Sequence, residues 1–186
     1  MSQPTPPGAR RRRRTPDDGT LEVFVADEQS DHEVDLPRWE ALARNVLAHE
    51  GVSGDAELSL IFVDEPTIAQ LNETFMEKTG PTDVLAFPID AEEDLVTGRS
   101  PDGGSAGPDR EPASDVPVLL GDVVICPSVA ARNAPGHAGT YDDEIALLIV
   151  HGILHVLGHD HATPEETEVM QARERELLGL YHRVER

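Results

Sequence analysis

The sequence predicts a single α/β domain, because stretches with the pattern of β-strands alternate along it with stretches that have the period of α-helices. Its 186 residues are about the length of one domain. Hydrophobic residues make up 38% of the chain and aromatic residues only 4%. The chain can therefore form a real core, which aliphatic side chains must build.

The first half of the chain contains two strand patterns, each followed by a helix pattern. Residues 21–27 (LEVFVAD) are rich in β-branched and aromatic side chains, which favour a strand. Residues 57–65 (ELSLIFVDE) hold a nearly continuous apolar run, typical of a buried central strand. Pro37 and Pro66 stand near the starts of two helices, where proline is tolerated. The apolar face of the first helix is formed by Trp39, Leu42, Ala43, Val46 and Leu47, and the inner face of the second by Ile68, Leu71 and Phe75.

Two more strands are expected in the middle of the chain. Residues 81–89 (PTDVLAFPI) indicate a short strand closed by Pro88. Residues 91–116 are acidic and rich in Gly, Pro and Ser, which is typical of a flexible surface insertion. Residues 116–127 (VPVLLGDVVICP) contain two apolar runs around Gly121, which indicate one strand with a bulge or a hairpin edge. Cys126 within this stretch is expected to be a small buried hydrophobic residue.

The last third of the chain predicts two helices. Residues 140–158 carry three acidic residues near their start, Asp142, Asp143 and Glu144, which complement the helix dipole, and are then apolar almost all round. This helix should be buried and should end at Gly158. Residues 163–166 (TPEE) form a capping box for a final helix that reaches about Leu178.

Charge and composition restrict the class of protein. The chain has a net charge of -21, which counts against RNA binding unless a local basic patch exists; Arg132, Arg173 and Arg175 are available for one. Residues 1–19 resemble a disordered tail with a run of arginines, Arg10–Arg14, and no apolar segment follows them as a signal peptide requires. A single cysteine fits a reducing cytosol, and no apolar run is long enough to span a membrane. We therefore expect a cytoplasmic protein.

The segment 151–161, HGILHVLGHDH, predicts a metal site. His151 and His155 are four residues apart on a helix, so both imidazoles project from the same face. Gly158 lets the chain turn, and His161 can then reach the same point. Three neutral imidazoles leave the fourth position of a tetrahedral ion open, as in catalytic zinc sites. This ligand set favours Zn²⁺, with Ni²⁺ or Cu²⁺ as other candidates, over Mg²⁺.

The other polar residues near this segment have less defined roles. His159 is expected not to bind the metal, because Gly158 breaks the helix between it and His155. Asp160 is either a partner that orients an imidazole or a turn residue. Four histidines outside the motif are expected to be ordinary surface residues: His32, His49, His137 and His182.

The histidine spacing is that of the metzincin peptidases, except that Gly152 stands where they carry their general base. The site must therefore use another base, or rely on the metal and on the chemistry of its substrate. RNA supplies such chemistry, because its 2′-hydroxyl is a built-in nucleophile.

The sequence also resembles the YbeY endoribonucleases, a family of rRNA maturation factors. The segment 151–161 matches their H-G-x-L-H-L-x-G-x-D-H signature. Residues 81–88 (PTDVLAFP) and 120–134 (LGDVVICPSVAARNA), with the pair Leu71 and Asn72, are similar to further segments of the family. These motifs occur in the family's order and span about residues 57–178.

The resemblance implies a mixed four-stranded sheet packed by about five helices, in a domain over residues 20–186. It implies Zn²⁺ or a similar ion on His151, His155 and His161. It also implies a cytoplasmic endoribonuclease that acts on single strands, matures the 3′ end of 16S rRNA and takes part in late ribosome quality control. Its partners would be rRNA and the small ribosomal subunit, not DNA or membranes, and its oligomeric state is left open.

One position departs from the family. Its members often carry an arginine that faces the substrate shortly after the Leu-Asn pair, and Met76 stands there in this chain. Lys78 is a candidate phosphate contact in its place. Asp83 and Asp160 are candidates for orienting roles in catalysis, with capping or turn chemistry as the alternative. A ribosome assembly factor without catalytic activity is the alternative function, and a zinc peptidase is a third.

Overall fold

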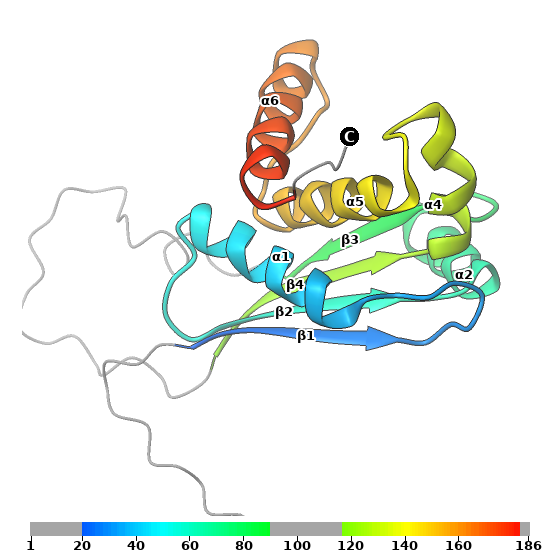
Figure 1. Ribbon diagram of the computed structural model, residues 1–186, viewed down its shortest axis with the longest axis horizontal. Coiled ribbons are helices and arrows are strands. Elements are labelled where there is room, and N and C mark those ends of the chain that lie inside the picture. The colour runs from blue at the N-terminus through cyan, green and yellow to red at the C-terminus, as the bar shows by residue number, and fades with distance from the viewer. Residues whose placement is uncertain (1–19, 90–116, 183–186) are drawn as a thin grey trace, which may run out of the picture.

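The computed structural model describes residues 20–89 and 117–182. The expected tail at residues 1–19 and the expected insertion at 91–116 lie outside the described residues. Within them the chain forms one α/β domain with four strands and five α-helices (Figure 1). In chain order these are β1 (Leu21–Asp27), α1 (Leu36–His49), β2 (Ala56–Phe62), α2 (Glu65–Met76), β3 (Val84–Pro88), β4 (Val118–Ile125), α4 (Pro127–Asn133), a 3₁₀ turn (Ala134–Gly136), α5 (Tyr141–Val156) and α6 (Pro164–Tyr181).

Short polar side chains set the starts of four of these helices. Asp35 and Asp64 accept hydrogen bonds from the first turns of α1 and α2, each of which carries a proline there. Thr140 caps α5, and Thr163 forms the expected capping box with Glu166 at the start of α6. The sequence signals for helix starts are thus confirmed.

The strands form a mixed sheet in the order β1-β2-β4-β3. Strands β1, β2 and β4 are parallel, and β3 runs antiparallel to β4. The stretch around Gly121 is one strand with a bulge, which is the first of the two arrangements that the sequence predicts. Leu119 pairs with Glu57 and Gly121 pairs with Leu58, so Leu120 is the extra residue. Gly121 has a φ of 148°, and a Cβ there would lie 2.4 Å from the carbonyl oxygen of Phe87. Only glycine fits this bulge.

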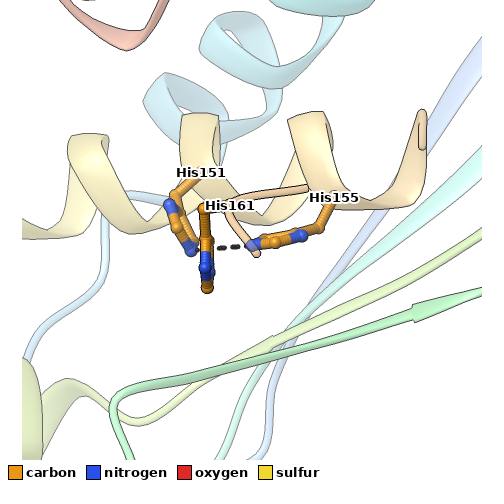
Figure 2. Close-up of side chains that lie close together, drawn as sticks. All are labelled: His151, His155 and His161. Carbon is orange, nitrogen blue, oxygen red and sulfur yellow. Dashed lines mark hydrogen bonds between the residues drawn. The ribbon is translucent and has the colours of Figure 1, made fainter. Parts of the chain in front are cut away.

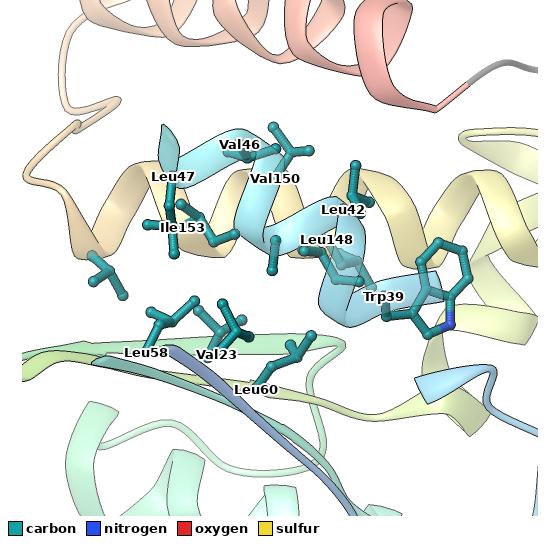
Figure 3. Packing of buried hydrophobic residues seen from close by; sticks show 14 of the residues in the cluster. Val23, Trp39, Leu42, Val46, Leu47, Leu58, Leu60, Leu148, Val150 and Ile153 are labelled. Atoms are coloured by element: carbon teal, nitrogen blue, oxygen red, sulfur yellow. The ribbon is translucent and has the colours of Figure 1, made fainter. Parts of the chain in front are cut away.

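Helices α1 and α5 cover one face of the sheet, with α6 packed above α5, and α2 lies on the other face (Figure 1). The larger core lies on the first face, where Val23, Leu58 and Leu60 of the strands point toward Trp39 of α1 and Ile153 of α5 (Figure 3). The five side chains predicted for the inner face of α1 are all buried. Helix α5 is buried along most of its length, as its apolar composition predicts. Cys126 is fully buried in the smaller core beside α2, as expected.

Three expectations about individual residues are wrong. Phe75 does not face the core: its side chain is 61% exposed and contacts the Phe87 ring edge-on, because Asn72 takes the buried position on this part of α2. Helix α6 does not end at Leu178 but continues through Gly179 to Tyr181. His182 is not a surface residue, since it is buried against Trp39 and hydrogen-bonded to Asp143.

Helix α5 lies close against the sheet at Gly152. A Cβ built at this position would lie 2.5 Å from Cγ1 of Val123 on β4, which is far inside van der Waals contact. Glycine in a helix interior costs about 0.5–1 kcal/mol relative to alanine. Glycine is needed here in spite of this cost, because a side chain at residue 152 would force α5 away from the sheet.

We predict that Gly152→Ala destabilises the protein in spite of the higher helix propensity of alanine. Overpacking against the stiff Val123 side chain should lower the free energy of unfolding by about 1–3 kcal/mol. Chemical denaturation measures this change. The double variant Gly152→Ala, Val123→Ala lacks the clash. Its loss of stability should therefore be smaller than the sum of the losses in the two single variants, and additive losses would contradict the close packing.

Candidate metal centre

The first two histidines of the motif project from one face of α5. Their Nε2 atoms lie 3.1 Å apart, and both rings are partly buried (Figure 2). Two nitrogens bound to one zinc ion at about 2.0–2.1 Å lie about 3.3 Å apart in a tetrahedron. Hence His151 and His155 already have the separation of two ligands of a single ion.

His161 reaches the same point from the loop after α5. Gly158 has a φ of 93°, which allows the chain to turn at the end of the helix. Asp160 accepts a hydrogen bond from the His161 backbone N–H at 2.7 Å. The His161 ring then lies with its centroid 5.7 Å from that of His151 and 4.9 Å from that of His155. One nitrogen from each of the three histidines lies within 4.8 Å of the others (Figure 2).

A buried carboxylate stands behind the first ligand. Oε1 of Glu174, on α6, lies 2.6 Å from Nδ1 of His151, and Glu174 is only 8% exposed. When this carboxylate accepts the Nδ1 proton, Nε2 keeps its lone pair toward His155, and the imidazole becomes a better ligand. Glu174 is not among the site residues that the sequence predicts. Its signal is a glutamate in the apolar stripe of a polar helix, four residues after Met170 and three before Leu177, both of which are buried.

The surroundings keep the middle ligand neutral. Burial lowers the pKa of His155 from its usual value, and the nearby His151 and His161 lower it further. A neutral imidazole is the form that binds a metal. Convergent nitrogens, neutral ligands and a carboxylate partner together fit a transition metal. The described residues thus place a His triad in position to bind one.

The missing peptidase base has a structural explanation. Residue 152 points at the sheet rather than toward the three imidazoles, since its position is filled by Val123. A glutamate could not occupy it without separating α5 from β4. The departure from the metzincin pattern is therefore a consequence of how this helix packs.

Two of the triad residues, His151 and His161, line a cleft between α5, α6 and the start of β3, with a cavity of about 350 Å³. Asp83, His137, His151, His161, Gln171 and Glu174 supply polar atoms to its wall. Among the described residues that line it there is neither lysine nor arginine. The local basic patch expected from the sequence is therefore absent from this wall. Arg132 is paired with Glu65, and Arg173 with Glu50 and Glu176.

Comparison with known proteins agrees with this geometry. A family model described as "Endoribonuclease YbeY" matches residues 24–182. The chain belongs to the YbeY endoribonuclease family. The YbeY protein of Nocardioides sp. is 46% identical over 153 residues, which cover 82% of this chain and 93% of the relative. That of Salinispora tropica is 43% identical and covers 87% and 96%. The solution structure of TM1509 from Thermotoga maritima has the same fold, with 24% identity, a TM-score of 0.52 and coverage of 86% and 91%.

Membership of the YbeY family places the protein among RNA-cleaving hydrolases. The structure also shows where the other residues singled out from the sequence lie. Asp83 lies on the cleft wall, where its Oδ1 accepts the Val84 N–H at 2.9 Å. Asp160 performs turn chemistry at the His161 backbone. His159 faces away from the triad, with Nε2 3.7 Å from Glu50.

Met76, where the resemblance predicts an arginine, is the last residue of α2, and Lys78, the candidate phosphate contact, lies two residues beyond it. Both side chains are exposed, and neither lines the cleft. Within the part of the chain that the structure describes, no helix is long and apolar enough to cross a membrane.

We predict that Glu174→Gln weakens metal binding by about 10-fold to 100-fold, because the neutral amide makes His151 a poorer ligand. Titration with Zn²⁺ against a competing chelator measures the affinity. Glu168→Gln, an exposed change on the same helix, is the matched control and should bind like the wild type. Equal affinities for the two variants would show that Glu174 does not act on the site.

The lowered pKa of His155 has a consequence for the metal-free protein. In the unfolded chain His155 takes up a proton near pH 6.5, whereas in the folded protein burial delays this uptake to lower pH. The contribution of His155 to stability is thus present above about pH 6.5 and is lost as the pH falls below it. Melting curves in chelator between pH 7.5 and 5.5 should show a larger loss of stability for the wild type than for His155→Gln. Parallel losses would contradict this assignment.

Proposed function

We propose that this protein is a metal-dependent endoribonuclease that cleaves single-stranded RNA, matures the 3′ end of 16S rRNA and takes part in late ribosome quality control in the cytoplasm. The observation that carries the metal dependence is the convergence of His151, His155 and His161 beside Glu174 at one wall of an open cleft. Family membership supports the cleavage of RNA.

The metal fits this activity through charge. A Zn²⁺ ion, or another transition metal, held by the three histidines would stabilise negative charge that develops on a phosphodiester. This matters here because no lysine or arginine lines the described cleft and the chain carries a net charge of -21. Glu174 orients His151, and Asp160 holds the His161 backbone. Asp83 fixes the start of β3 at the rim of the cleft.

The cleft also fits the substrate class. Its volume of about 350 Å³ is at the lower end of ligand sites, so it accommodates one part of a single strand rather than a duplex. We propose rRNA in the small ribosomal subunit as the partner, and neither DNA nor a membrane. The acidic chain gains little affinity from contacts with RNA phosphates, so contacts with the ribosome must supply part of the binding energy.

The test is cleavage of a single-stranded RNA that carries the 3′ precursor sequence of 16S rRNA. The wild type should bind about one metal ion and cut this RNA. Chelation or His155→Ala should abolish both properties, and added Zn²⁺ should restore cleavage to the chelated wild type. His159→Ala, which changes a histidine outside the triad, is the matched control and should keep both.

Two results would contradict the proposal. Cleavage that survives complete metal removal would exclude a metal-dependent enzyme. A wild type that binds metal and the small subunit but does not cut RNA would favour the assembly factor, and Met76→Arg would then be the first variant to examine for recovered cleavage.

A further inference from the structure

A second histidine–carboxylate pair lies at the cleft. His137 follows the 3₁₀ turn that precedes α5, and its Nδ1 lies 2.9 and 3.0 Å from the two carboxylate oxygens of Glu144. Glu144 is fully buried in the first turn of α5 and also accepts the Ala138 backbone N–H at 3.1 Å. From the sequence alone, His137 is expected to be an ordinary surface residue. The structure gives it a buried carboxylate partner, so that view is incomplete.

The pair fixes which ring nitrogen of His137 is available. A carboxylate accepts hydrogen bonds, so Nδ1 must carry a proton and donate it to Glu144. In the neutral ring Nε2 then holds the lone pair, and in the protonated ring it holds the second proton. The side chain of His137 is 60% exposed, and no hydrogen-bond partner of Nε2 is described in residues 20–89 and 117–182. Nε2 is the nitrogen that a bound molecule would meet.

His137 and the triad share the same cleft. Glu144 and His151 are seven residues apart on α5, which places them on the same face about 10 Å apart along the axis. His137, His151 and His161 all line the cavity of about 350 Å³. A substrate that fills a space of this size contacts His137 together with His151 and His161 of the triad.

We propose that His137 is a catalytic residue of the RNA cleavage, which transfers a proton at the leaving oxygen, and that Glu144 positions it. This inference rests on the proposed function. As the attacking oxygen forms its bond to phosphorus, the bond between phosphorus and the leaving oxygen breaks. Protonated His137 gives its Nε2 proton to the leaving oxygen, which departs as a hydroxyl, and the proton of the attacking oxygen passes to solvent. A carboxylate that holds Nδ1 and leaves Nε2 free is the arrangement that orients imidazoles for such transfers.

The competing explanation is that the pair only ties the loop before α5 to the helix. To hold the loop against α5, Glu144 needs only a hydrogen-bond donor such as Nδ1 of His137. The Ala138 backbone N–H already donates to the same carboxylate. Such a tie does not require an exposed imidazole on the wall of the cleft. The variant His137→Asn separates the two roles, because its side-chain amide can donate to Glu144 from the place of Nδ1 but cannot transfer a proton.

We expect His137→Asn to lower kcat on RNA by 10²-fold to 10⁴-fold, the usual contribution of a general acid or base. Metal content and melting temperature should stay close to those of the wild type. His49→Gln is the matched control, since His49 is an exposed histidine whose Nδ1 is also hydrogen-bonded, in this case to Tyr181. It should keep full activity. Wild-type activity in His137→Asn would overturn the proposal and leave the proposed function intact, whereas a wild type that cuts no RNA would overturn both.

Two further readouts respond to proton transfer but not to a structural tie. An RNA with sulfur in place of the leaving oxygen should restore cleavage by His137→Asn to within about 10-fold of the wild type, because a thiolate leaves without a proton. Equal losses on both substrates would overturn the role. The pH profile of kcat/KM should lose one limb in the variant. The other groups at the cleft that titrate, Asp83, His151, His161 and Glu174, remain in both proteins, so an unchanged profile would contradict the assignment.

The tautomer can be observed directly in the metal-loaded protein. Long-range ¹H–¹⁵N spectra should show neutral His137 with its proton on Nδ1. A proton on Nε2 would show that Glu144 does not position the ring and would overturn that part of the proposal.

Discussion

The site depends on how closely helix α5 lies against strand β4. At Gly152 the helix backbone rests on the Val123 side chain, with no room for a Cβ between them. This contact fixes both the height of the helix above the sheet and its rotation about its own axis. With the glycine facing the sheet, the neighbouring His151 and the following His155 are turned toward each other and toward His161. Gly152, which distinguishes this motif from the metzincin motif, is therefore also the residue that orients the ligands on α5.

Most of the fold is encoded in local patterns that the sequence shows directly. The apolar face of α1 follows the helical period, and proline, aspartate and threonine mark the helix starts. The triad is equally local, since His151 and His155 are one turn apart and Gly158 explains how His161 returns. Such features need no knowledge of distant parts of the chain. The four-stranded mixed arrangement came from the family resemblance, because strand order is not written in any local pattern.

What the sequence analysis missed was contact between distant segments. Glu174 meets His151 across 23 residues, and His182 meets Asp143 across 39. Burial alone would raise the pKa of Asp143, yet the hydrogen bonds from His182 and Thr140 lower it on balance. A pattern of residues on one helix cannot reveal such a partner on another. Phe75 has the correct spacing for an inner face, but Asn72 takes the buried position on this part of α2, and Phe75 lies exposed against the Phe87 ring.

The order of the strands has a consequence for how the chain folds as it is made. Strand β3 leaves the ribosome before β4, yet within residues 20–89 and 117–182 it pairs with β4 alone, and the inner edge of β2 also waits for β4. Helix α5, which covers the sheet, comes later still. A nascent chain that ends before residue 118 therefore carries unpaired strand edges and an uncovered apolar face, which are the features that promote association between chains. Such a chain can complete its core only after β4 and α5 have been made, so its yield should depend on chaperones that hold the unfinished polypeptide.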